Sequence, residues 1–196
     1  MKQFISIALF FYSLNSFSQT AYKDSLDHFI KDYIEKHEVV TGDDKKLLRF
    51  YPVNEKYHVT ARFEKADNGK WFSMETSGTM KQVYRVYGII HFKINDTTVK
   101  LNIYQSQYLM TTKEYKNHLF LPFTDLTSGE ETYDNGRYID LEIGDVKNNS
   151  VTIDFNKAYN PYCAYVSDTY NCPIPPKENY LPVAILAGEK KYGKSH

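Results

Sequence analysis

Short segments in which apolar and polar residues alternate fill the middle of this chain of 196 residues. In the clearest one, every second residue from Tyr57 to Phe63 is apolar, which is the period of a β-strand with one buried face. Turn-forming residues such as Asp67-Asn68-Gly69 separate these segments. The predicted strands are residues 57–64, 71–76, 82–94, 98–105, 118–123, 137–143 and 151–156, with 181–187 as a closing strand.

This pattern predicts a mainly β fold. Parallel βαβ winding is excluded because it needs a helix between successive strands, and no such helices are indicated. Short connections join neighbouring antiparallel strands, so we expect a single antiparallel barrel or sandwich of about seven or eight strands. Asn148-Asn149 is a turn signal, which predicts that residues 137–143 and 151–156 form one hairpin.

One N-terminal amphipathic helix is predicted ahead of the strands, at about residues 24–38. Its apolar residues recur at helical spacing, as Leu26, Phe29 and Tyr33 do, and charged residues occupy the other face. His37 ends this apolar stripe, where a histidine at the edge of the core is favoured over a ligand. Residues 43–49 are predicted to form a short second helical turn.

The first eighteen residues have the three parts of an export signal. Lys2 supplies the positive charge, residues 4–14 the apolar run, and Ser16-Phe17-Ser18 a small-x-small cleavage site. The apolar run is shorter than the roughly 20 residues that a membrane anchor needs. We therefore expect a signal peptide at residues 1–18 and one exported β-rich domain at residues 19–196, periplasmic or secreted. No later stretch indicates an integral membrane segment.

The charge of the chain is balanced. It has 24 basic and 24 acidic side chains, so it lacks the positive surface that nucleic acids and anionic membranes attract. We therefore expect no nucleic-acid partner. The predicted mature part has about 178 residues, which fits one domain with its own core.

The acidic block from residue 121 to residue 176 concentrates the special residues of the chain. It contains both cysteines, five of the seven prolines and six of the eighteen tyrosines. In an exported chain, a pair separated by a short loop, as Cys163 and Cys172 are, more often forms a disulfide than a metal or catalytic site. A disulfide is therefore predicted, with free thiols or a cysteine nucleophile as alternatives. The nucleophile is the weaker idea, because the block contains no histidine to act as its base.

Seven polar residues of this block form the candidate site. If residues 137–143 and 151–156 pair, Asp140 and Asp154 share the face opposite the core. Two neighbouring carboxylates can serve as general acid and base, or as half of an oxygen-ligand metal site. The candidates for ligand binding are Glu131, Tyr133, Arg137, Asp140, Asp154, Asn156 and Asn160.

Two functions fit these residues, and a structural role competes with both. An arginine such as Arg137 can bind a small polar or anionic ligand bidentately, whereas a small exported hydrolase would use Glu131, Asp140 or Asp154. In the structural alternative, Arg137 bridges to Glu131 or Asp140, and Asp125 stabilises a turn. No spacing indicates a zinc site, a phosphate-binding loop or a nucleophile elbow, so no metal or cofactor is predicted. The tyrosines expected as flat walls are Tyr133, Tyr138, Tyr159 and Tyr162.

Four linked motifs in the second half of the chain resemble the domain of unknown function 1684 family. They are LPFTDLTSGEETYDNGRYIDLE, DFNKAYNPYCAY, CPIPP and LPVAILAGEK. The segments FYPV, YHVTARFE, SGTM and YGIIHFKI fit its N-terminal half, so the resemblance spans roughly residues 50–190. It implies a single β-rich domain with its site in these motifs. It implies no reaction, because the family has no established activity.

Overall fold

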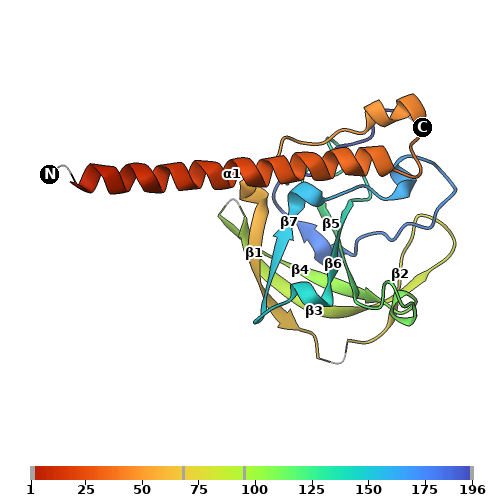
Figure 1. Cartoon of the computed structure of the whole chain (residues 1–196). Coiled ribbons are helices and arrows are strands. Elements are labelled where there is room, and N and C mark those ends of the chain that lie inside the picture. The colour runs from red at the N-terminus through yellow and green to blue at the C-terminus, as the bar shows by residue number, and fades with distance from the viewer. Residues whose placement is uncertain (1–2, 68, 95, 195–196) are drawn as a thin grey trace.

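The computed structural model describes residues 3–67, 69–94 and 96–194, with residues 3–18 described by their backbone alone. One long helix, α1 (Gln3–Lys36), precedes the strands, and its second half lies against them (Figure 1). The strands are β1 (His58–Lys65), β2 (Phe72–Met74), β3 (Gln82–Ile94), β4 (Thr97–Ser106), β5 (His118–Asp125), β6 (Arg137–Glu142), β7 (Ser150–Asp154) and β8 (Tyr180–Leu181). Short 3-10 helices lie at Gly42–Leu47, Glu55–Tyr57, Leu109–Thr111, Ile143–Asp145, Phe155–Lys157, Tyr162–Ala164 and Lys177–Asn179.

The eight strands of the described chain form one curled sheet, which makes a half-barrel (Figure 1). Along the sheet the order is β6-β5-β4-β3-β1-β7, with β2 paired to β3 and β8 paired to β5. Every strand pair is antiparallel except β5 with β8, which is parallel. The prediction of a mainly β fold with one N-terminal helix is therefore confirmed.

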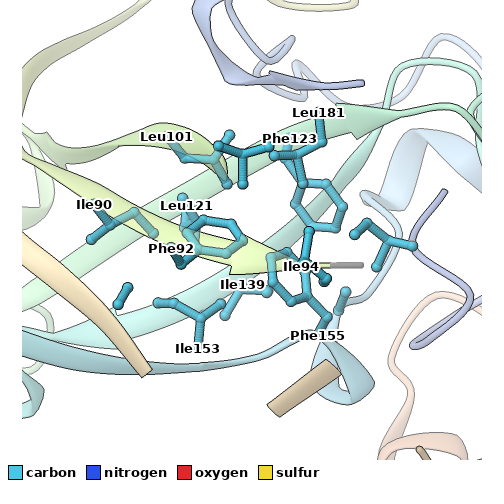
Figure 2. Close-up of a cluster of buried hydrophobic side chains, with 14 of the residues drawn as sticks. Ile90, Phe92, Ile94, Leu101, Leu121, Phe123, Ile139, Ile153, Phe155 and Leu181 are labelled. Atoms are coloured by element: carbon cyan, nitrogen blue, oxygen red, sulfur yellow. The ribbon is translucent and has the colours of Figure 1, made fainter. Parts of the chain in front are cut away.

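The hydrophobic core fills the inside of this curl. Strand alternation places Ile90, Phe92 and Ile94 of β3 on the inner face, where they meet apolar side chains of other strands (Figure 2). The ring of Phe155 lies 5.8 Å from that of Phe92 and 5.3 Å from that of Phe123. Because each such side chain contributes about 1.5–3 kcal/mol when fully buried, this cluster is the main source of stability.

The predicted hairpin between residues 137–143 and 151–156 is wrong. β6 pairs with β5, and β7 pairs with β1, so the two strands lie at opposite ends of the sheet order. The 3-10 helix Ile143–Asp145 follows β6 directly and redirects the chain. Asn148 and Asn149 do form a tight turn, with φ values of 51° and 56°, but it bridges only Lys147 to Ser150.

The predicted closing strand at residues 181–187 is shorter in the structure. Only Tyr180–Leu181 pairs with another strand, although Val183, Ile185 and Ala187 keep the alternating burial of a strand. The side chains of Arg137 and Asp125 instead form hydrogen bonds with part of the backbone of this segment. The apolar period therefore identified a buried extended segment, but not its hydrogen-bond partners.

Helix α1 is longer than predicted at its start and ends at Lys36 rather than at residue 38. No proline or glycine precedes residue 24, so nothing local breaks the helix there. The predicted apolar stripe faces the sheet, since Leu26 is buried and Phe29 and Tyr33 are half-buried. Within the described residues, none of the helices combines the length and the hydropathy that a membrane crossing requires.

Candidate functional site

A cleft of about 980 Å³ lies between the second half of α1, strand β6 and the loop that holds the disulfide. We call it the tyrosine cleft, because Tyr33, Tyr138, Tyr159, Tyr162 and Tyr170 all line it. Its remaining walls are Phe29, Asp32, Lys36, His37, Glu38, Met80, Gln82, Asp140, Pro161, Thr169, Asn171, Cys172 and Pro173.

The tyrosines are held in place from both sides of the cleft. Tyr138 and Tyr159 exchange backbone hydrogen bonds of 2.9 and 3.1 Å, and their rings meet edge to face at 5.8 Å. Burial raises the pKa of both phenols well above 10.0, and Asp140 adds to the effect on the pKa of Tyr159. Both therefore stay neutral and can donate hydrogen bonds. At the rim, the rings of Tyr162 and Tyr170 lie 5.1 Å apart.

His37 is a buried wall of the cleft with one unused nitrogen. Its side chain is held among tyrosine rings, the nearest being Tyr165 at 4.6 Å, and only 7% of the residue is exposed. Nδ1 accepts a hydrogen bond of 2.9 Å from the backbone N–H of Val40, so the proton of the neutral ring belongs on Nε2. Burial lowers the pKa of His37, and Lys45 lowers it further. Nε2 is buried and has no hydrogen-bond partner among the described residues.

Asp140 brings a carboxylate to the cleft from the outer face of β6. One oxygen contacts Nε2 of His118 at 2.9 Å, and the other accepts a hydrogen bond of 2.8 Å from the hydroxyl of Tyr159. Each oxygen keeps a further acceptor position. Of the seven predicted site residues, Asp140 alone lines the tyrosine cleft.

Asp140 and Asp154 line one smaller hollow of about 380 Å³. The curl of the sheet brings them there from its two ends, so their common location has a different cause from the predicted hairpin. Asp154 accepts a hydrogen bond of 3.1 Å from the hydroxyl of Tyr22 on α1, and it caps the 3-10 helix that follows it. Tyr22 therefore links the helix to the end of β7.

Arg137 is a structural residue in this fold and has no exposed surface for a ligand. Its side chain is 1% exposed and forms an ion pair of 3.1 Å with Asp125, whose side chain is fully buried. The predicted bridges to Glu131 or Asp140 are therefore wrong. The guanidinium also donates hydrogen bonds to the backbone carbonyl oxygens of Ile185, Ala187 and Glu189. Asp125 in turn accepts a hydrogen bond of 2.8 Å from the backbone N–H of Ile185. Together the two side chains form hydrogen bonds with the segment 185–189 that a neighbouring strand would otherwise form.

The other candidates are spread over the molecule. Asn156 is buried and bonds both the N–H and the carbonyl oxygen of Asn54. Asn160 is buried behind the cleft, where its side chain donates to the carbonyl oxygen of Lys190. Glu131 is exposed and pairs with Lys190 at 3.4 Å, and Tyr133 lines a separate hollow beside Cys163. The seven predicted residues therefore do not converge on one cavity.

Glu189 is a buried carboxylate directly behind the cleft wall. It is 0% exposed and accepts hydrogen bonds from the hydroxyls of Tyr165 at 2.8 Å and Tyr33 at 3.2 Å, and from the backbone N–H of Asn160 at 2.8 Å. Burial raises its pKa from 4.5 to about 7, although these hydrogen bonds act in the opposite direction. Tyr33 comes from α1, so Glu189 fixes the helix to the body of the domain.

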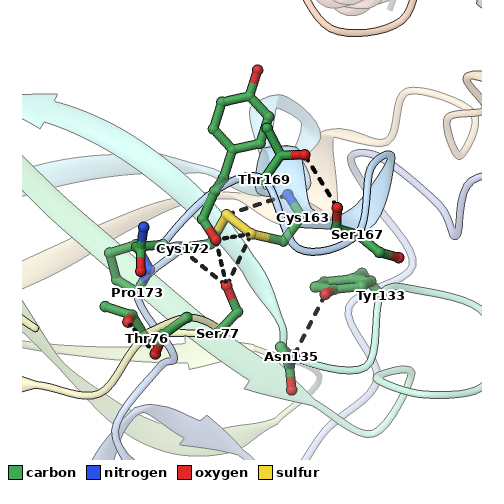
Figure 3. Close-up of a disulfide and its surroundings, with 12 residues drawn as sticks. Thr76, Ser77, Tyr133, Asn135, Cys163, Ser167, Thr169, Cys172 and Pro173 are labelled. Atoms are coloured by element: carbon green, nitrogen blue, oxygen red, sulfur yellow. Dashed lines mark hydrogen bonds between the residues drawn. A yellow bond between two sulfur atoms is a disulfide. The ribbon is translucent and has the colours of Figure 1, made fainter. Parts of the chain in front are cut away.

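The disulfide between Cys163 and Cys172 confirms the predicted pairing. Figure 3 shows it beside Ser77, whose hydroxyl contacts Sγ of Cys163 at 3.0 Å and accepts a hydrogen bond of 3.1 Å from the backbone N–H of Cys172. Backbone hydrogen bonds from Ser77 to Cys172 and from Ile174 to Glu75 join the same two loops. The disulfide therefore stabilises the loop that supplies Tyr170 to the rim of the cleft.

Replacing Cys163 and Cys172 together with serine should lower the free energy of unfolding by about 2–3 kcal/mol, because the short closed loop no longer restricts the unfolded chain. Urea unfolding of the variant and the wild type measures this difference. Thiol titration of the denatured, unreduced wild type is the control and should detect no free thiol. Two thiols per chain would contradict the assignment.

Sequence reasoning did not single out His37, Glu189 or Asp125 as functional or central residues. A signal for Glu189 exists, because its charge follows the apolar run LPVAILAG. The signal for His37 was weaker, because a residue that ends an apolar stripe is usually an ordinary residue at the edge of the core. Its unused nitrogen depends on where Val40 and the tyrosines lie, which the sequence pattern does not contain.

Comparisons with known proteins place this arrangement in a family. Residues 45–190 match the family model described as protein of unknown function, DUF1684. The solution NMR structure of the uncharacterized protein from gene locus rrnAC0354 of Haloarcula marismortui is similar, with a TM-score of 0.63 and 28% sequence identity over 89% of this chain and 93% of that chain. No curated protein matches the chain. Since the family model covers most of the sequence, the chain belongs to the DUF1684 family.

Proposed function

We propose that this chain is an exported binding protein that holds a small polar ligand in the tyrosine cleft. The observation that carries the proposal is the wall of the cleft, which combines five tyrosines with the buried His37, whose Nε2–H has no partner among the described residues. Ligand sites are usually concave and largely apolar, with a few fixed polar groups that orient the ligand. A buried donor without a partner is costly unless another molecule supplies its acceptor.

Export is supported by the N-terminal sequence and by the disulfide. Disulfides persist in oxidising compartments and are rare in the cytosol, and residues 1–18 have the pattern of a signal peptide. Expression of the full chain in a bacterial host should yield periplasmic or secreted protein whose first residue lies near Gln19. N-terminal sequencing of that protein tests the export part of the proposal separately.

The alternative function, a small exported hydrolase, has less support. Glu131 forms a surface ion pair with Lys190. The carboxylate of Asp154 already accepts hydrogen bonds from the hydroxyl of Tyr22 and from the backbone N–H of Asn156. Of the three carboxylates predicted for a hydrolase, Asp140 alone lines the tyrosine cleft. Catalysis by two carboxylates needs both at one substrate, which favours binding over hydrolysis.

A thermal-shift screen of small polar compounds tests the binding function. A ligand at 100 times its Kd should stabilise the wild type by about 2.7 kcal/mol. The double variant Tyr162→Ala/Tyr170→Ala should lose most of this stabilisation, because both exposed rings lie at the rim of the cleft. Tyr108→Ala is the matched control, since Tyr108 is also exposed but lies outside the walls of the cleft. Hits that stabilise all three proteins equally would show binding elsewhere and contradict the proposal.

A further inference from the structure

We propose that the tyrosine cleft selects a small organic cation that also carries an oxygen acceptor. This inference deepens the proposed function and rests on it. Three properties of the cleft support it: uncompensated negative charge, aromatic faces, and one buried hydrogen-bond donor.

The charged groups of the cleft leave an excess of carboxylates. Its cation, the ammonium of Lys36, is already taken by Asp32 at 2.7 Å. Glu38 and Asp140 accept hydrogen bonds from tyrosine hydroxyls at 3.1 and 2.8 Å. Within the described part of the chain, neither carboxylate has an ion pair with lysine or arginine, and the basic group that Asp140 contacts is the imidazole of His118. The wall therefore carries negative charge that a ligand can neutralise.

The tyrosine rings add to this preference. The face of an aromatic ring attracts cations, and several rings around one space form the kind of site that binds quaternary ammonium groups. Tyr162 and Tyr170 meet at the rim, whereas Tyr138 and Tyr159 form the inner wall. Glu38 lies next to Tyr162, and Asp140 next to Tyr159. Each aromatic pair thus has a carboxylate beside it.

His37 supplies the independent observation that points to a ligand. Its residue is more than nine-tenths buried, it lines the cleft, and the N–H of its Nε2 has no partner among the described residues. A donor in this position needs an acceptor, so a bare alkylammonium would leave it unsatisfied. A hydroxyl or carbonyl oxygen on the ligand would accept this hydrogen bond while the cationic group lies among the tyrosines.

Four small probes separate these features. Choline has both the cation and the oxygen, 3,3-dimethyl-1-butanol replaces the cationic nitrogen by carbon, tetramethylammonium lacks the oxygen, and 3,3-dimethylbutyrate carries a negative charge. Binding to the full-length protein is measured by isothermal titration at low salt and pH 8, where an ordinary histidine is neutral. We expect choline to bind at least about fivefold more tightly than the neutral alcohol and than tetramethylammonium. The anion should bind most weakly.

Variants assign each preference to a residue. Asp140→Asn should weaken choline several-fold without changing the binding of the neutral alcohol, because only the charged probe loses an attraction. Asp134→Asn, at an exposed carboxylate outside the walls of the cleft, is the matched control and should change neither. His37→Gln should reduce the ratio between choline and tetramethylammonium affinity toward one. This ratio compares two ligands on the same variant, so a loss of folded protein affects both affinities equally and leaves the ratio unchanged.

Several results would overturn the inference. If choline and the neutral alcohol bind equally, and both depend on Tyr162 and Tyr170, the cleft is a ligand site without cation selectivity and the proposed function survives. If the anion binds most tightly, the charge argument is wrong. If none of the probes binds at millimolar concentration, the cation inference fails, and the broad compound screen then decides the proposed function on its own.

Discussion

Replacing Arg137 with alanine should lower the free energy of unfolding by about 3–5 kcal/mol, the usual cost of breaking a buried ion pair. The side chains of Arg137 and Asp125 are 1% and 0% exposed, so the substitution leaves the buried carboxylate of Asp125 without its ion-pair partner. The substitution also leaves three backbone carbonyl oxygens of the segment 185–189 without their donor. Urea unfolding of the variant and the wild type measures the loss.

A surface ion pair provides the control for the Arg137 variant. Lys190→Ala removes the exposed pair with Glu131 and should cost about 1 kcal/mol or less, because exposed pairs are screened by water. Arg137→Lys keeps the charge but cannot donate to several carbonyl oxygens at once, so we expect an intermediate loss. If Arg137→Ala cost no more than Lys190→Ala, the ion pair would not be what holds the segment 185–189 to the sheet.

The stability of the protein should fall by about 3 kcal/mol between pH 4.5 and pH 7 through Glu189 alone. The pKa of Glu189 is raised from 4.5 to about 7 in the folded protein. Between these values, the folded state keeps a proton that the unfolded state releases, so stability decreases as pH rises. The contribution is fully present below pH 4.5 and is lost above about pH 7. Groups around the carboxylate are the neutral Tyr33 and Tyr165 and the cation Arg137.

Urea unfolding at several pH values, with wild type and Glu189→Gln side by side, tests this dependence. The glutamine does not titrate, so the stability of the wild type minus that of Glu189→Gln should fall by about 3 kcal/mol as pH rises from 4.5 to above 7. Histidines titrate in the same range, but they are common to both proteins and cancel in the difference. Glu131→Gln, at an exposed carboxylate, should show no such change. Parallel curves for wild type and Glu189→Gln would contradict a proton held by Glu189.

Local patterns predicted the elements of this fold well. The period-two alternation from Tyr57 to Phe63 corresponds to β1, and the apolar stripe of Leu26, Phe29 and Tyr33 faces the sheet as expected. Cys163 and Cys172 are close in sequence, so their pairing also depends mainly on local chain geometry. The strand and the helix follow from short-range periodicity. The disulfide follows from the presence of only two cysteines, which allow a single pairing within the chain.

The candidate site was predicted only in part. Tyr138, Tyr159 and Tyr162 do line one cleft, as expected of flat walls, and Asp140 lies beside them. Arg137 was predicted to bind a ligand because a guanidinium can bond a polar or anionic group bidentately. Its burial depends on the segment 185–189, which lies about 50 positions further along the chain. Composition does not reveal such a partner.

The sequence by itself determined the β-rich class, the N-terminal helix, the disulfide and the block that supplies much of the cleft. Only the tertiary structure decided which strands pair, because alternation specifies the faces of a strand and not its neighbours. It thus separated β6 from β7, yet the curl of the sheet returned Asp140 and Asp154 to one hollow. It also decided the roles of Arg137, Glu189 and His37. Burial and unused hydrogen-bonding groups arise from segments distant in sequence, so they exist only once the chain has folded.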